Sequence, residues 1–248
     1  MPKFVELWVY LSATPLFGLT ATLAVYVLAL AAYAALAQAP WANPVLWTVL
    51  VLATGLLLTG VPYPTYFAGA QFIHFLLGPA VVALAWPLWQ RRIELRQRWS
   101  RLLAAAALAG GAVASASAGL LGWALGLPIE VVLSLVPKSV TAPVAMGIAE
   151  KIGGIPALAA VFAVVTGLVG ALAGKYLFDA VRVPTDSPGW AARGFALGTA
   201  AHGIGAARAL QVNSDAGAYA GLALGLQVVL ASLLIPLAYQ LWALFSVL

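Results

Sequence analysis

Four long stretches of the chain contain no charged residue: 7–90, 102–129, 152–174 and 216–248. Each can hold one or more membrane spans, because a helix needs about 20 apolar residues to cross the hydrocarbon core of a bilayer. Runs such as 22–37 are apolar on every face, whereas the strands of a transmembrane barrel alternate between apolar and polar positions. The pattern therefore predicts an all-α polytopic membrane protein of about seven to nine helical segments.

The apolar runs between polar turns predict the individual spans. The third span is interrupted at Gly78-Pro79 and the last one contains Pro236, and proline breaks or bends a helix. The expected segments are 15–36, 44–58, 66–89, 102–125, 156–178 and 221–248.

Two further segments depart from this apolar pattern. Residues 128–154 hold charges, hydroxyls, prolines and a Gly-Gly pair, and residues 194–210 are short and rich in glycine. We expect discontinuous or re-entrant helices in both segments, because proline and glycine interrupt helices. With the interruption in the third span, the residues expected to break helices are Pro79, Pro137, Pro143, Gly198, Gly203 and Gly205.

Composition and charge sharpen this prediction. Of the 248 residues, 64% are hydrophobic and 8% are charged, against about 25% charged residues in soluble domains. Five arginines lie between Arg91 and Arg101, and the positive-inside rule predicts a cytoplasmic loop there rather than a nucleic-acid site. A second basic loop, 179–193, favours the same side, so residues 128–154 would enter and leave the membrane from the outer side.

Metal, cofactor and enzyme functions are not expected. The chain has no cysteine and two histidines, His74 and His202, too few for a transition-metal site. Neighbouring residues on a helix point about 100° apart, so Lys138 and Ser139 make a poor catalytic dyad, and a Ser139–His202 pair lacks an orienting acid. We interpret His74 as a packing residue.

The residues from Pro137 to Pro143 form the first candidate site. Polar groups at membrane depth are costly and mark cavities or the protein interior. Prolines and hydroxyls favour the start of a half-helix here, and its free N–H groups together with Lys138 would stabilise a carboxylate. The alternative is that Lys138 extends to the membrane interface while the prolines merely end a helix.

The second candidate site surrounds His202. Glycines on both sides would let the helix unwind, and His202 is either a buried imidazole bonded to a backbone carbonyl or a group that binds substrate or relays protons. Glu150 is either a proton-coupling carboxylate or part of an exposed pair with Lys151. Two discontinuous elements meeting at the midplane are typical of secondary transporters. The substrate-binding candidates are Lys138, Ser139, Thr141, Thr199, His202 and Arg208, and the coupling candidates are Glu150 and His202.

Three motifs carry a resemblance to a known family. Pro-Lys-Ser-Val-Thr begins at Pro137 and is followed by Gly-Gly-Ile-Pro from Gly153; Arg-Gly-Phe-Ala-Leu-Gly-Thr-Ala-Ala-His-Gly-Ile-Gly occupies 193–205; Leu-Gly-Pro-Ala occupies 77–80. These motifs resemble the LrgB/CidB family of bacterial membrane proteins over nearly the whole chain. Ala142 and Ala206 stand where the family often has threonine, so a hydroxyl role is not expected there.

The resemblance implies one LrgB-like transmembrane domain over residues 1–248 in the bacterial inner (plasma) membrane. It also implies two functions. One is antiholin-like control of murein hydrolase export and cell lysis, with a small LrgA/CidA-type partner; the other is transport, since plastid relatives carry glycolate and glycerate and bacterial relatives are linked to pyruvate uptake.

Physical arguments favour the transporter. A buried Lys-Ser-Thr cluster opposite a glycine-flanked histidine suits one compact site per protomer, whereas a pore that permeabilises lipid does not need it. We therefore favour an ion-coupled carrier of small monocarboxylates over the holin-like regulator. Faces of small residues, such as Gly167, Gly170 and Gly174, suit close helix packing and a homodimer.

Overall fold

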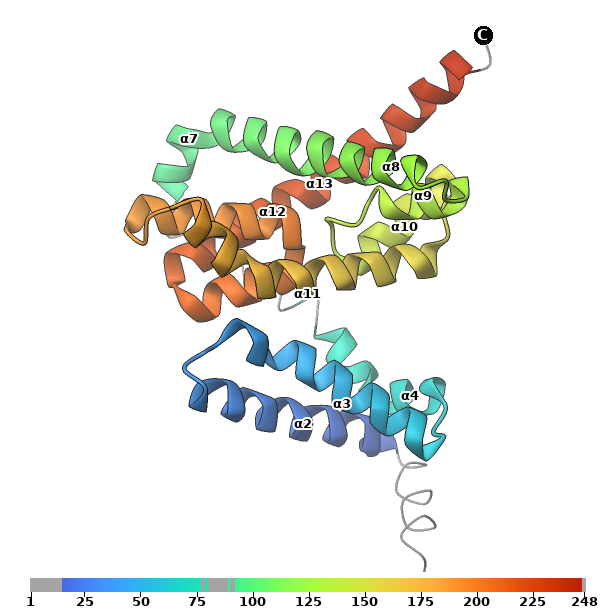
Figure 1. The fold of residues 1–248 in the computed structure, drawn as a ribbon, viewed down its shortest axis with the longest axis vertical. Helices are drawn as coiled ribbons and strands as arrows, with labels where there is room; N and C mark the ends of the chain where they lie inside the picture. The colour runs from blue at the N-terminus through green and yellow to red at the C-terminus, as the bar shows by residue number, and fades with distance from the viewer. Residues whose placement is uncertain (1–14, 77–78, 80–88, 90–91, 247–248) are drawn as a thin grey trace, which may run out of the picture. The chain divides into compact units, whose positions relative to one another are not determined.

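The computed structural model describes residues 15–76, 79, 89 and 92–246, and within them every regular element is helical. The chain divides into two compact units, unit 1 (Met1–Ala83) and unit 2 (Leu84–Leu248). The predicted all-α membrane class is confirmed (Figure 1). Among the described residues, three helices contain stretches long and apolar enough to cross a membrane, Leu16–Ala35, Pro156–Ala180 and Ser214–Leu244. The single domain over residues 1–248 stays a prediction.

Unit 1 contains the first two predicted spans at nearly the predicted bounds. Asn43 caps α3, since its Oδ1 accepts hydrogen bonds from the N–H groups of Val45 (2.9 Å) and Leu46 (3.2 Å). The third predicted span begins earlier than expected, and its break at Gly78-Pro79 lies almost wholly outside the described residues. The helices are α2 (Pro15–Ala35), η1 (Pro40–Ala42), α3 (Pro44–Thr59) and α4 (Tyr63–Phe75).

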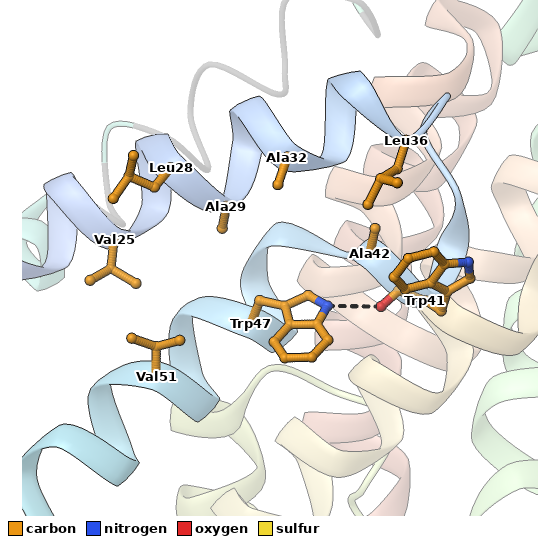
Figure 2. Close-up of a pocket in the computed structure, with 9 residues that line it drawn as sticks. All are labelled: Val25, Leu28, Ala29, Ala32, Leu36, Trp41, Ala42, Trp47 and Val51. Carbon is orange, nitrogen blue, oxygen red and sulfur yellow. Dashed lines mark hydrogen bonds between the residues drawn. The ribbon is translucent and has the colours of Figure 1, made fainter.

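Close packing and one apolar pocket characterise unit 1. α2 lies against α4, where the Thr22 hydroxyl is 2.7 Å from the Tyr66 hydroxyl. A pocket of about 380 Å³ lies between α2, η1 and α3, and the nine residues that line it are all apolar or tryptophan. Figure 2 shows how Trp47 donates its indole N–H to the carbonyl of Trp41 (3.0 Å) at one end of this pocket.

Unit 2 begins with a continuous helical run made of α7 (Arg92–Ala105), the π-helix η2 (Ala106–Val113) and α8 (Ala114–Ala124). The predicted loop of arginines is therefore wrong from Arg92 onward. Arginine, glutamate, glutamine and leucine are good helix formers, so this polar stretch is helical and is continuous with the apolar helix that follows it.

The rest of unit 2 consists of α9 (Ile129–Leu135), α10 (Ala142–Ile152), α11 (Pro156–Ala180), α12 (Ser187–Val212) and α13 (Ser214–Ser246). The predicted polar loop over 179–193 is present but shorter, because α11 continues to Ala180 and α12 begins at Ser187. Asp186 caps α12 through a hydrogen bond from the Gly189 N–H to its Oδ1 (2.8 Å), with a proline in the first turn. Such a cap starts a helix, so α12 is longer than the predicted segment 194–210.

The two ends of unit 2 are defined by different contacts. At one end Leu102 and Ala106 pack with Ala191 and Phe195 of α12. At the other end Gly122 of α8 lies against α9. The run from α7 to α8 is therefore antiparallel to α11, and the arginines of α7 lie at the same end as the α11–α12 connection, as the re-entrant arrangement of 128–154 requires.

Candidate functional site

α12 is interrupted in its middle, as predicted from the glycines of this segment. The non-helical residues are Ala201 (φ −118°, ψ 15°) and His202 (φ 41°, ψ −134°), which lie between the predicted glycines. The φ of His202 falls in a region that residues with side chains rarely adopt. Strain of this kind costs about 1–3 kcal/mol and persists only where the surrounding structure holds it.

The chain reverses direction at this break. A Cβ on Gly205 would lie 2.7 Å from the carbonyl oxygen of Leu197, although eight residues of straight helix span about 12 Å. Residues 187–200 and 203–212 therefore form an antiparallel pair, hereafter the α12 hairpin, with His202 at its tip (Figure 1). The contacts with α13 agree with this reversal: Gly194 with Ala216, Gly198 with Ala220, and Leu210 with Gly217.

The tip of the α12 hairpin packs against the middle of α11. A Cβ on Gly167 would come within 2.7 Å of Cε1 of His202, and one on Gly170 would overlap the side chain of Ala201. The small-residue face of α11 thus serves close helix packing within the chain. Because Gly167 and Gly170 are near the midpoint of the 25-residue α11, the tip lies about halfway along a candidate membrane span.

The His202 side chain is fixed by one hydrogen bond. The imidazole is 4% exposed, and its Nε2 lies 2.7 Å from the carbonyl oxygen of Ala163 on α11. A carbonyl only accepts hydrogen bonds, so Nε2 carries the hydrogen. Nδ1 is then an acceptor in the neutral ring and a donor in the imidazolium. This is the buried imidazole bonded to a backbone carbonyl, the first of the two alternatives for His202, and a substrate or proton at Nδ1 stays a prediction.

Residues 136–141 separate α9 from α10, so the predicted discontinuity in 128–154 is present. The predicted half-helix start within Pro137–Pro143 is present at the end of that range, because α10 begins at Ala142 with Pro143 in its first turn, three residues after Ser139. The Val140 N–H donates to the carbonyl of Pro137 (3.2 Å) and closes a turn, and the helix restarts only beyond this turn. Thr141 occupies the N-cap position without a side-chain capping bond.

A residue that the sequence did not single out, Ser134, anchors this break. Its hydroxyl donates to the carbonyl of Glu130 (2.6 Å) and accepts from the N–H of Ile155 (2.7 Å). A Cβ on Gly154 would lie only 3.0 Å from the Ser134 nitrogen, so glycine permits this approach. The end of α9 is thereby joined to the turn after α10, and both ends of the segment lie at the same end of unit 2.

Lys138 contacts a different helix from His202. Its Nζ donates to the carbonyl of Ala114 (3.0 Å), and Ala114 is the first residue of α8 after the π-helix η2. Runs of π-helix are rare and often occur at functional sites. The ammonium therefore joins the α9–α10 break to α8, and the Lys138 side chain is half-buried.

The two broken elements meet at one turn of α11. Val140 and Ala145 belong to the same buried cluster as Ala163, and the carbonyl of Ala163 accepts the hydrogen bond from His202. The first turn of α10 and the tip of the α12 hairpin therefore both lie beside the first half of α11. At this tip the first half of α12 ends and the second half starts.

The other candidates lie at different distances from this junction. Ser139, Thr199 and Arg208 are buried and Thr141 is half-buried. The Thr199 hydroxyl donates to the carbonyl of Phe195 in its own helix (2.8 Å). Glu150 is exposed in the last turn of α10, at the opposite end of that helix from the junction, and its coupling role stays a prediction.

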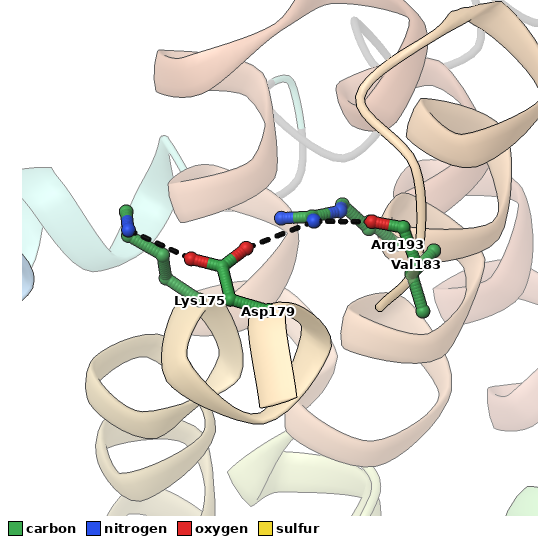
Figure 3. Close-up of polar contacts among 4 residues, drawn as sticks. All are labelled: Lys175, Asp179, Val183 and Arg193. Carbon is green, nitrogen blue, oxygen red and sulfur yellow. Dashed lines mark hydrogen bonds and ion pairs between the residues drawn. The ribbon is translucent and has the colours of Figure 1, made fainter. Parts of the chain in front are cut away.

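An ionic cluster that the sequence did not predict joins α11 to α12 (Figure 3). Arg193 is 7% exposed, and its guanidinium donates to Asp179 Oδ1 (2.9 Å) and to the carbonyl of Val183. Lys175 donates to the other carboxylate oxygen (2.8 Å). These bonds hold the base of the α12 hairpin, and the only sequence signal for them is the Lys175–Asp179 spacing of four residues.

Comparison with known proteins decides the family. The LrgB-like family model matches residues 22–241, nearly the whole chain. The chain belongs to the LrgB-like family. Similar proteins include an uncharacterized protein of Haemophilus influenzae, 35% identical over 80% of this chain and 84% of that protein. YwbG, an uncharacterized protein of Bacillus subtilis, is 35% identical over 77% and 82%. The holin-like protein CidB of Staphylococcus aureus is 31% identical over 79% and 84%. No solved structure matches the chain.

The junction of this LrgB-like chain is suited to bind an anion. The first turns of α10 and of the second half of α12 have N–H groups without partners inside the helix, and each helix N-terminus carries partial positive charge. Lys138 and Arg208 belong to these two elements. The junction thus has backbone donors and the imidazole of His202, while Lys138 bonds to α8 and Arg208 lies six residues beyond His202 on the second half of α12.

Proposed function

We propose that the chain carries small monocarboxylates of the pyruvate, glycolate or glycerate type across the membrane. The observation that carries this proposal is that the first turn of α10 and the tip of the α12 hairpin both lie beside the first half of α11. Helix N-termini bind carboxylates and phosphates through backbone N–H groups and the helix dipole. Discontinuous helices that direct their N-termini at an anion near the midplane are typical of secondary transporters.

In the proposed site, the N–H groups at the start of α10 hold the substrate carboxylate. Lys138 and Arg208 offset its charge, and Ser139, Thr141 and Thr199 supply hydroxyl groups around it. His202 Nδ1 donates to the bound anion once the ring is protonated, so substrate and proton bind together. The second candidate for proton coupling is Glu150, which lies at the opposite end of α10 from the proposed site.

The two broken elements reach the proposed site from opposite ends of unit 2. The hydrogen bond between Ser134 and Ile155 anchors the α9–α10 segment near the start of α11. The bond between Arg193 and Asp179 anchors the base of the α12 hairpin near the end of α11. A site between two such elements suits alternating access. We propose that the end with the basic residues of α7 faces the cytoplasm of a bacterium, following the positive-inside rule.

A second candidate function comes from the relatives. CidB of Staphylococcus aureus carries the name holin-like protein and is 31% identical over 79% of this chain. In this alternative the chain regulates murein hydrolase export and cell lysis together with a small LrgA/CidA-type membrane partner. A homodimer stays a prediction in either case, and the small-residue face of α11 packs within the chain.

Uptake into proteoliposomes distinguishes these two functions. The purified protein is reconstituted alone with an entrapped dye, and labelled pyruvate and glycolate are added under an imposed pH gradient. A carrier gives saturable uptake that the two acids inhibit mutually, with the dye retained. Dye release, or uptake only after an LrgA-type partner is added, supports the holin-like function instead.

One variant pair tests the carboxylate assignment. Lys138→Ala is expected to lower the apparent affinity for both acids at least about tenfold, since a hydrogen bond to a charged group contributes about 1.5–3 kcal/mol. Lys151→Ala is the matched control, because Lys151 is exposed at the end of α10. If Lys138→Ala transports with unchanged affinity and rate, Lys138 does not hold the carboxylate.

A further inference from the structure

α13 carries a buried amide that neither the packing nor the proposed carboxylate site explains. Gln227 is 1% exposed, and its Oε1 has no hydrogen-bond partner among the described residues. Its neighbours along this face of α13, Ala220, Ala223 and Ala231, are each 0% exposed. An alanine face would pack without a polar group, and a buried amide oxygen without a donor costs free energy. A ligand that supplies the donor would remove this cost.

The position of Gln227 places it at the level of the two broken elements. Two turns earlier on α13, Ala220 lies against Gly198 of the α12 hairpin. One turn later, Ala231 belongs to the buried cluster that contains Val140 and Ala163. Gln227 lies between these contacts on the same buried face of α13. Gln227 is therefore on α13 between the level of the α12 hairpin and the level of the cluster that contains Val140 and Ala163.

We infer that Gln227 is a specificity-determining residue that accepts a hydrogen bond from the 2-hydroxyl group of a small 2-hydroxy monocarboxylate. This inference rests on the proposed transport function. The carboxylate is held by the helix N-termini, and a hydroxyl on the adjacent carbon donates to Oε1 of Gln227. A 2-oxo acid has no hydrogen to donate at that carbon, and an unsubstituted acid has no polar atom there. The amide is uncharged, so it does not repel the anion.

Inhibition of uptake by the wild-type protein gives the first test. Labelled glycolate is taken up by proteoliposomes, and unlabelled glycolate, pyruvate and acetate compete with it. We expect glycolate to inhibit at least about tenfold more strongly than either other acid, since a site that hydrogen-bonds a hydroxyl rejects analogues without one. Equal inhibition by the three acids overturns the inference, whatever the behaviour of any variant. Absence of uptake of every acid overturns the proposed function and the inference with it.

A matched pair of variants on α13 gives the second test. Gln227→Met keeps the volume of the side chain and removes the amide. In this variant we expect glycolate to inhibit uptake no more strongly than acetate does, and the inhibition by acetate to change less than about twofold. Gln240→Leu is the control, because Gln240 is exposed on the same helix. An unchanged ratio of glycolate to acetate inhibition in Gln227→Met overturns the inference and leaves the transport function intact.

Discussion

The two broken elements of unit 2 interrupt their helices by different means. Between α9 and α10, residues 136–141 are not helical. Side-chain hydrogen bonds join Ser134, near the end of α9, to Ile155, and Lys138, within the break, to Ala114. In the α12 hairpin the reversal takes two residues, Ala201 and His202, and the second has a positive φ. One break is a polar, proline-containing segment, and the other is a sharp and strained turn.

The two breaks also differ in cause, since local sequence accounts for one and tertiary packing for the other. The prolines and hydroxyls of the α9–α10 segment favour an interruption in isolation, because proline cannot occupy a helix interior without losing a hydrogen bond. The α12 hairpin has no proline near its tip. Its reversal depends on close approach to α11 and α13, where glycines face Ala201, His202 and Ala220. Tertiary packing therefore holds the second break in place.

The largest expected effect is the loss of the α12 hairpin in Gly198→Leu. A Cβ on Gly198 would overlap the backbone of Ala220, which cannot move aside as a flexible side chain would. Overpacking of this kind costs about 3 kcal/mol or more. We expect little monodisperse protein in detergent by size-exclusion chromatography.

The control for this substitution is Gly225→Leu on α13, where a Cβ meets nothing within 4 Å. It should elute and melt like the wild-type protein. If Gly198→Leu behaves like Gly225→Leu, close packing against Ala220 does not hold the hairpin.

Comparison of sequence and structure supports this division. The interruption of 128–154 was predictable from its prolines, charges and Gly-Gly pair, and α10 starts at the end of the expected range. The reversal at His202 was not predictable, because glycines indicate that a helix is weak and do not specify the direction of the chain after the break. The arginines of α7 were assigned to a loop, since charge was weighted above their helix propensity.

Gln227 and Ser134 were missed for a related reason. Each is a neutral polar residue inside an apolar run, and its sequence neighbours do not show whether it is buried. The structure shows the burial of both side chains and the bond of Ser134 to Ile155. The candidate residues at charged or glycine-rich positions were easier to find, because such positions are rare in apolar segments.

Loss of the Ser134 anchor is expected to have the next largest effect. Ser134→Ala removes the acceptor for the Ile155 N–H and the donor to Glu130. The two lost hydrogen bonds each contribute about 0.5–1.5 kcal/mol. We expect a lower melting temperature in detergent for Ser134→Ala and no comparable change for Thr59→Ala. Thr59 is an exposed residue whose hydroxyl bonds only within its own helix. Equal melting temperatures would show that side-chain bonds do not fasten the α9–α10 break.

Two substitutions of His202 separate its backbone strain from its side-chain bond. His202→Ala and His202→Gly both remove the imidazole and its bond to Ala163, but only glycine adopts the positive φ without steric cost. We expect His202→Gly to be more stable than His202→Ala by about 1–2 kcal/mol, measured by thermal unfolding in detergent. Neither variant should transport at the wild-type rate. A more stable alanine variant would contradict the strained geometry of the tip.

The smallest expected loss of stability is that of Pro143→Ala, which is compared with the loss in Gly198→Leu. Pro143 lies in the first turn of α10, where its missing N–H would have no intrahelical partner. Pro143→Ala therefore loses no hydrogen bond, and the increased freedom of the unfolded chain should destabilise the protein by about 0.4–1 kcal/mol. The same thermal unfolding assay should show a small decrease with uptake retained. A loss as large as that of Gly198→Leu would mean that Pro143 itself maintains the break, and that the Ser134 and Lys138 bonds follow from it.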